Sequence, residues 1–227
     1  MWYSAEMRFG GKSGRDLTIW NGGIVAAVAL CLGIASTLAA REAPYATPGS
    51  GTVQGRFLVA NPSMPDRRFA RTVILMVRHD ETGAFGLVIN KPVGFAEITD
   101  EPNEESEGDT PEDEVMVRLR AHYGGPVEPN KAFVIHSPDY RIDSTVQVTR
   151  RVAVTADPRI LEDITDGNGP KKMLYIVGYS GWGPGQLENE IRRNDWYTAP
   201  VEAALIFGEQ ESDKSWKRAM EMRLQGI

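Results

Sequence analysis

Cysteine and histidine are scarce in this 227-residue chain, which contains one cysteine and three histidines. A single cysteine cannot form an intramolecular disulfide, and it cannot supply the paired thiolates of a zinc ribbon. The histidines, His79, His122 and His136, are 43 and 14 residues apart, so the sequence contains no closely spaced pair of metal ligands. We therefore predict no metal and no cofactor, and we interpret each histidine as a hydrogen-bonded residue near a strand end.

The rest of the composition is typical of a folded protein. Hydrophobic residues make up 41% of the chain and charged residues 25%. These proportions exclude a wholly disordered, collagen-like or multi-span membrane protein. At roughly 150 residues per domain, the length allows one domain with additional segments or two small domains. We expect a single core.

One long apolar run lies near the N-terminus. Residues 24–40 contain no charge and no proline, and Arg8, Lys12 and Arg15 precede them. As a helix this run would be about 25 Å long, close to the ~30 Å of a bilayer core, and its positive flank would stay in the cytoplasm. We expect residues 1–40 to be a membrane-directing leader, either a cleaved signal peptide or an anchor that contacts the membrane through residues 24–40. A start codon assigned too far upstream is the alternative.

The remaining chain contains a linker and, further on, an acidic segment. Residues 41–52 are rich in Pro, Gly, Ser and Thr, which predicts a linker before a domain over residues 53–227. Within that domain, ten of the eighteen residues in 97–114 are acidic and none is basic, so we expect a solvated insert. Without these ten charges the formal net charge changes from -6 to +4. The acidic balance therefore belongs to the insert.

Short apolar runs separated by turn residues fill the rest of the chain. Three helices are expected, beginning at Asp157-Pro158, at Pro184 and at Asp213. Because most of the expected strands come before the helices, the pattern indicates an α+β fold. The predicted strands span residues 56–60, 72–78, 84–90, 115–122, 132–136, 145–149 and 173–179, with a hairpin turn at 80–83.

The most unusual motif is GYSGWGPGQ at residues 178–186, between a predicted strand and a predicted helix. This position suits an anion cradle, but neither the P-loop pattern nor Gly-x-Gly-x-x-Gly is present. Ser180 suggests a nucleophile elbow, yet Trp182 stands where Gly-x-Ser-x-Gly requires its last glycine. The simpler interpretation is a tight turn whose Trp182 either packs into the core or is exposed to a partner.

Several motifs, taken in order, resemble those of the YqgE/AlgH family. The resemblance runs from about Val53 to the C-terminus. It implies an α+β fold of coiled, bifurcated, mixed β-sheets with a few flanking helices. The motifs are GRFLVANPSM at 55–64, Asp66 with FARTV at 69–73, GAFGLVINKP at 83–92, YGGPV at 123–127, FVIH at 133–136, and GYSGWGPGQL at 178–187 with Glu190 and Trp196.

The resemblance implies no catalytic residue, because the family has none established, and its label of transcriptional regulator names no DNA-binding element. This chain differs from the family pattern in Ser180, where alanine is common, in the acidic insert and in the leader. The motif residues are the candidates for a shared binding surface: Asn61, Pro62, Met64, Asn90, Gly124, Gly125, Pro126, His136, Gly181, Trp182 and Gln186.

We therefore expect a non-enzymatic binding or regulatory module at the membrane or envelope, whose partner is a protein or a small ligand. The first alternative is a cytosolic transcriptional regulator, if the leader is a start-site artefact, since an exported domain never meets DNA. The second is a hydrolase or phosphate-binding enzyme that uses the turn at residues 178–186.

Overall fold

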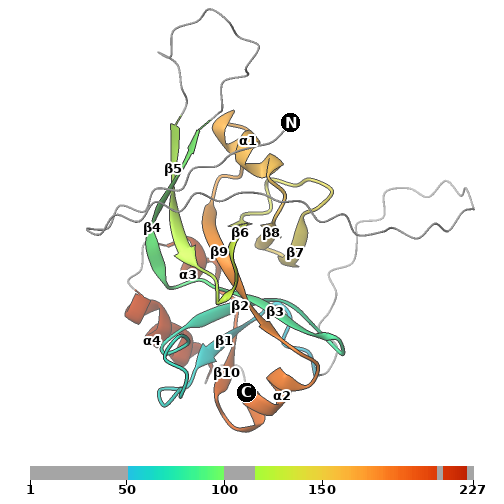
Figure 1. Ribbon diagram of the computed structural model, residues 1–227, viewed down its shortest axis with the longest axis vertical. Coiled ribbons are helices and arrows are strands. Elements are labelled where there is room, and N and C mark those ends of the chain that lie inside the picture. The colour runs from blue at the N-terminus through green and yellow to red at the C-terminus, as the bar shows by residue number, and fades with distance from the viewer. Residues whose placement is uncertain (1–50, 100–115, 209–211, 224–227) are drawn as a thin grey trace, which may run out of the picture.

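The computed structural model describes residues 51–99, 116–208 and 212–223 (Figure 1). The helices in these ranges are α1 (Arg159–Thr165), α2 (Gln186–Arg192), α3 (Ala203–Phe207) and α4 (Ser212–Met222). The strands are β1 (Arg56–Ala60), β2 (Val73–Asp80), β3 (Gly83–Val88), β4 (Pro92–Thr99), β5 (Met116–Tyr123), β6 (Val127–His136), β7 (Val146–Thr149), β8 (Val152–Thr155), β9 (Met173–Trp182) and β10 (Trp196–Pro200).

These strands form one branched sheet, and β9 is its branch point. The main path runs β10-β1-β2-β3-β9-β6-β8-β7, while β5 pairs with both β4 and β9. The first half of β9 pairs with β5 in parallel and with β6 in antiparallel, and its last residues pair with β3. The remaining pairings between the described strands are antiparallel. The predicted α+β fold with a bifurcated, mixed sheet is confirmed.

Three glycines allow the sheet to branch. Gly178 has a φ of +71° where β9 passes from one set of partners to the other, a conformation that favours glycine. Gly124 and Gly125 follow β5 and lie directly against this bend. A Cβ on Gly124 would be 2.2 Å from the carbonyl oxygen of Gly178, and one on Gly125 would be 2.2 Å from the carbonyl carbon of Tyr179. Side chains therefore do not fit at this crossing.

Hydrogen bonds fix the same crossing. The Gly124 N–H donates to the carbonyl oxygen of Val177 at 2.8 Å. The Gly124 carbonyl accepts from the N–H of Val88 at 3.0 Å and from the buried hydroxyl of Ser180 at 3.0 Å. The end of β3, the loop after β5 and the second half of β9 are thus held at one point.

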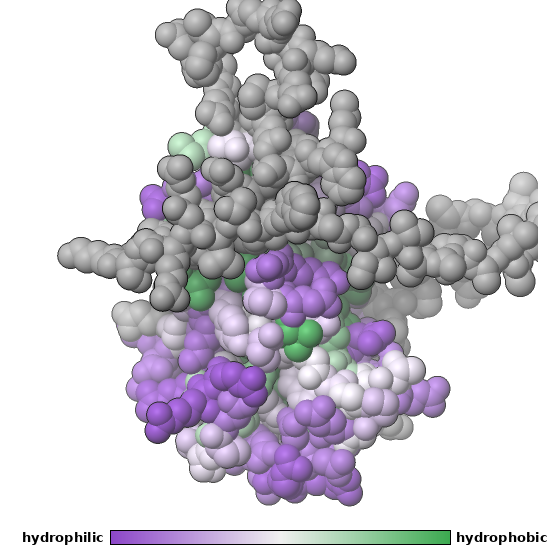
Figure 2. Space-filling view, in the orientation of Figure 1, coloured by the Kyte–Doolittle hydropathy of each residue, from purple (hydrophilic) through white to green (hydrophobic). Residues whose placement is uncertain are grey.

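The helices cover different faces of the sheet (Figure 1). α4 packs on β1, β2 and β10 through residues that include Met222, and α3 lies against β9 and buries Leu205 and Ile206 in the same cluster. α2 covers the opposite face with Leu187. α1 packs against β4 and β5 through its isoleucines and Leu161. The expected core is therefore divided into three clusters, because a branched sheet presents more than one buried face. The outer surface over the end that carries α2 is mostly hydrophilic (Figure 2).

The acidic insert is shorter than the sequence predicts. Residues 97–99, which we assigned to the insert, are the last residues of β4. Their alternation explains this, because Ile98 is buried while Glu97 is paired in register with Arg118, an opposite charge across the strand pair. The rest of the insert, at residues 100–114, lies outside the described residues.

The leader at residues 1–40 and most of the linker also lie outside the described residues, so the membrane-directing function stays a prediction. Among the helices that the structure describes, none is long and apolar enough to cross a bilayer. Val53, where the domain is predicted to begin, is part of the packed structure. Val53 is buried, and its N–H donates to Nδ1 of His79 at 3.1 Å.

The glycine crossing gives a matched test of stability. We expect Gly124→Ala to lower the free energy of unfolding by about 3 kcal/mol or more, because its Cβ would overlap the backbone at Gly178. Gly183→Ala is the control, since the nearest atom is 4.0 Å from its Cβ, and it should change stability by less than about 1 kcal/mol. Urea unfolding followed by circular dichroism measures both, and equal effects would contradict the role of the crossing.

Candidate functional site

Five of the eleven candidate residues meet at one pocket of about 320 Å³, which we call the motif pocket. Gly181 and Trp182 come from the end of β9, Gln186 from the start of α2, Met64 from the loop after β1, and Pro126 from the segment before β6. The glycine crossing brings the last of these to the end of β9. The remaining lining residues are Pro65, Asp66, Arg68, Phe69, Glu190, Arg193, Asp195 and Trp196.

The Glu190 carboxylate organises one wall of the motif pocket. Its Oε2 accepts hydrogen bonds from the indole Nε1 of Trp182 and of Trp196, both at 2.8 Å. Its Oε1 accepts from Nε2 of Gln186 at 3.0 Å, and the Gln186 side chain in turn accepts from the N–H of Gly183 at 3.1 Å. With both oxygens engaged by the protein, this carboxylate positions aromatic rings and is not arranged to act as a base.

Charges at the rim of the motif pocket are paired within the protein. Arg68 lies 2.7 Å from Asp66, and Arg193 lies 2.7 Å from Asp195. The hydrogen bond from the Arg68 side chain holds the pKa of Asp66 below its usual range. Exposed pairs of this kind contribute about 1 kcal/mol or less to stability, so they can exchange partners at little cost. The rim offers both a cation and an anion on each side.

Aromatic rings form the apolar part of the motif pocket. Trp182 and Trp196 pack edge to face with centroids 6.1 Å apart, and Phe69 packs on Trp196 at 5.6 Å. Trp182 is 8% exposed and belongs to a buried cluster, which agrees with the first of the two interpretations of this turn, in which Trp182 packs into the core. Burial is possible because the indole N–H donates a hydrogen bond to Glu190, so it is not left without an acceptor when the ring is removed from water.

Four other candidates support the pocket without lining it. The Asn61 side chain donates to the carbonyl oxygen of Asn194 at 2.7 Å and to the hydroxyl of Tyr197 at 2.9 Å, which fixes the loop carrying Met64. Pro62 lies in the exposed turn of the same loop. The remaining two, at positions 124 and 125, form the glycine crossing behind Pro126.

Asn90 and His136 lie away from the motif pocket. The Asn90 side chain accepts from the N–H of Val73 at 2.8 Å and donates to the carbonyl oxygen of Ser212 at 3.0 Å, so it joins β2 to the start of α4. His136 is fully buried in β6, with its ring nitrogens 2.9 Å from the carbonyl oxygen of Ser137 and 2.9 Å from Oγ1 of Thr155. Both residues are internal connectors.

The other two histidines also lie apart. Nε2 of His79 is 3.0 Å from Oε1 of Glu188. His122 is buried and its Nδ1 has no hydrogen-bond partner among the described residues; desolvation, with the charge of Arg120, lowers its pKa to about 4. Within residues 51–99, 116–208 and 212–223, no three His, Cys, Asp or Glu side chains gather as a metal site would require.

The turn at residues 178–186 lacks the features of a hydrolase or an anion cradle. Ser180 is 1% exposed, and its hydroxyl donates to a main-chain carbonyl. The N–H of Gly183 is already bonded to the Gln186 side chain, and that of Gln186 to the carbonyl oxygen of Gly183. In this turn Ser180 is therefore not exposed for use as a nucleophile, and the N–H groups of Gly183 and Gln186 are already used within the protein.

Sequence reasoning quoted Glu190 and Phe69 among the family motifs but did not place them among the candidate site residues, and it did not connect Arg68 or Arg193 with the pocket. A further signal was present, because Gln186 and Glu190 are four residues apart and so share a face of the predicted helix. Nothing in the sequence places the two indoles on that carboxylate, since Trp182 precedes the helix and Trp196 follows it.

Comparisons with known proteins give a consistent result. The family model described as AlgH-like matches residues 57–226. A UPF0301 protein of Cereibacter sphaeroides is 43% identical over 166 residues, which are 71% of this chain and 87% of that protein. A UPF0301 protein of Rhizobium etli is 40% identical over 177 residues, or 75% and 86% of the two chains. The solution structure of the AlgH protein from Pseudomonas aeruginosa is similar with a TM-score of 0.60 and 31% identity, over 82% of this chain and 93% of that one.

The Glu190 network can be tested by substitution. We expect Glu190→Ala to lower the free energy of unfolding by about 2 kcal/mol and to shift tryptophan emission, because two buried indole N–H groups lose their acceptor. Glu190→Gln keeps one carbonyl acceptor and should cost less. Glu81→Ala, in an exposed turn, should stay within about 0.5 kcal/mol of the parent. Equal urea midpoints for Glu190→Ala and Glu81→Ala would contradict the network.

Proposed function

This chain belongs to the AlgH-like family, and from that premise we propose that it is a non-enzymatic binding module that engages a protein partner through the motif pocket. One observation carries the proposal. Residues that the sequence singles out in separate segments, among them Met64, Pro126 and Gln186, converge on one pocket. Around them, Gln186 and the indoles of Trp182 and Trp196 are hydrogen-bonded to the Glu190 carboxylate, which fixes one wall of the pocket and favours binding over a reaction.

The chemistry of the pocket favours a polar segment of a protein over a strongly charged small molecule. Its aromatic rings supply apolar contact, and its rim carries arginine and aspartate in equal number. Such a rim has no large excess of either charge, so it suits an extended peptide that offers both donors and acceptors. Its volume of about 320 Å³ is at the lower end for ligand pockets, enough for one or two side chains.

Photo-crosslinking in the producing cell tests the pocket directly. A photoreactive residue in place of Arg193, which lines the pocket, should give a discrete adduct with a partner protein. The same residue in place of Arg192 is the matched control, because that exposed neighbour on α2 does not line the pocket.

A blocking variant makes the crosslinking result specific. Pro65→Trp, at an exposed residue that lines the motif pocket, should obstruct the pocket and remove the Arg193-position adduct while the protein stays folded, as judged by its circular dichroism spectrum. Adducts of equal yield at positions 192 and 193, or an Arg193-position adduct that persists in Pro65→Trp, would contradict the proposal.

We also propose that residues 24–40 hold or deliver the module to the membrane or envelope. The support is the uncharged run and its positive flank. Fractionation of cells producing the C-terminally tagged full chain, followed by intact-mass determination, distinguishes the cases. We expect either uncleaved chain in the membrane or a chain beginning near Ala40 in the envelope. A shorter soluble product in the cytosol would contradict this and restore the regulator alternative.

A further inference from the structure

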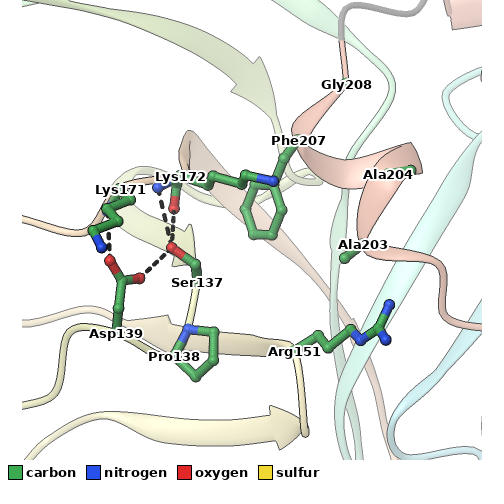
Figure 3. A pocket seen from close by; sticks show the side chains of 10 residues that line it. All are labelled: Ser137, Pro138, Asp139, Arg151, Lys171, Lys172, Ala203, Ala204, Phe207 and Gly208. Atoms are coloured by element: carbon green, nitrogen blue, oxygen red, sulfur yellow. Dashed lines mark hydrogen bonds between the residues drawn. The ribbon is translucent and has the colours of Figure 1, made fainter.

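A second pocket, of about 670 Å³, lies at the opposite end of β9 from the motif pocket (Figure 3). Lys171 and Lys172 directly precede β9 and line it, Arg151 reaches it from the turn between β7 and β8, and Phe207 reaches it from α3. We call this the basic pocket. It shares no lining residue with the motif pocket, so an inference about it stands apart from the function proposed above.

A hydrogen-bonded frame holds the lysine side of the basic pocket. The N–H of Lys172 donates to Oγ of Ser137 at 3.0 Å, and the N–H of Ser137 donates to the carbonyl oxygen of Lys172 at 2.9 Å. The Ser137 hydroxyl also donates to Asp139, whose other oxygen accepts from the N–H of Lys171 at 3.1 Å. The backbone positions of both lysines are therefore fixed, as Figure 3 shows.

The only carboxylate that lines the basic pocket is largely engaged by this frame. The hydroxyl of Ser137, together with the N–H and charge of Lys171, holds the pKa of Asp139 below its usual range, so it stays ionised with its oxygens in use. The side chains of Arg151, Lys171 and Lys172 form no ion pair with the described residues. Three cations and one carboxylate leave a formal charge of +2 on the lining.

The rest of the lining is apolar. In Figure 3 the side chain of Lys172 extends toward the ring of Phe207, and Arg151 points toward the part of α3 that carries Ala203. The cations therefore surround an apolar surface. A volume of about 670 Å³ is far more than an inorganic anion fills and is in the range of pockets for small organic ligands.

We propose that the basic pocket binds a small organic phosphate monoester, with its dianionic phosphate between Arg151 and Lys172 and its apolar or ring-shaped body against Phe207. Charge complementarity carries the choice of phosphate, because a phosphate dianion matches the formal charge of the lining whereas a carboxylate supplies half of it. We expect the ligand to have an apolar part because the ring of Phe207 lines the same pocket. The chemistry is that of a mononucleotide, and also that of a phosphatidic acid headgroup with its lipid.

Equilibrium dialysis of the purified full chain tests this with three probes: AMP, inorganic phosphate and adenosine. We expect AMP to bind at least about tenfold more tightly than either of its parts, because only AMP reaches both the cations and Phe207. Raising the salt concentration should weaken AMP binding, since the contacts are exposed charges. Binding of AMP that is no tighter than that of inorganic phosphate would overturn the proposal.

Variants locate the binding. Arg151→Ala combined with Lys172→Ala should weaken AMP binding by about tenfold or more, and both are exposed positions whose loss leaves the core intact. Lys217→Ala on α4 is the matched control and should change binding by less than about twofold.

Competition between AMP and vesicles that contain phosphatidic acid distinguishes a lipid from a soluble ligand. Vesicles that displace AMP from the parent protein but not from Lys217→Ala would act through α4, which does not line the basic pocket, and would contradict a site shared by AMP and the lipid. Equal displacement from both identifies a lipid source, and no displacement identifies a soluble one. Unchanged AMP affinity in the double variant overturns the proposal.

Discussion

The close approach of two backbone segments, at Gly124–Gly125 and at Gly178, is the contact on which the rest of the structure depends. Nothing larger than hydrogen fits between them, because a Cβ would lie 2.2 Å from main-chain atoms of the other segment. The contact lets β9 leave β5 and β6 and continue as a partner of β3. The same contact brings Pro126 to the end of β9, where Gly181 and Trp182 lie, so the geometry of the sheet and that of the motif pocket have one origin.

The two pockets differ in how the protein uses its own polar groups. In the motif pocket, the Glu190 carboxylate and the rim arginines are bonded to partners within the chain, so the surface is preorganised and close to electrically balanced. In the basic pocket, the frame around Ser137 uses main-chain groups and Asp139, and it leaves the cationic side chains available. A pocket whose charged side chains are paired within the protein selects a ligand mainly by its shape. A pocket with unpaired cations selects a ligand mainly by its charge.

Periodicity predicts those parts of the fold that depend on local pattern. The strand at residues 56–60 has the predicted bounds, and the Asp80–Gly83 turn joins β2 and β3 as expected. β4 was missed because its glutamate looks like part of the acidic insert, and β8 and β10 because each is short and follows polar residues. For the site, the family resemblance supplied Trp182 and Gln186, but the convergence of two indoles on Glu190 is a tertiary contact that no spacing encodes.

The pairing of β1 with β10 also determines when this protein can finish folding. Arg56 lies opposite Pro200, so the first strand of the domain receives one of its two neighbours only after nearly the whole chain has been made. At ordinary rates of synthesis that delay is on the order of 10 s, during which the apolar residues of β1 lack their final cover. Before that, β1 can pair with β2 but not with β10, so the sheet is completed only when the C-terminal part of the domain has left the ribosome.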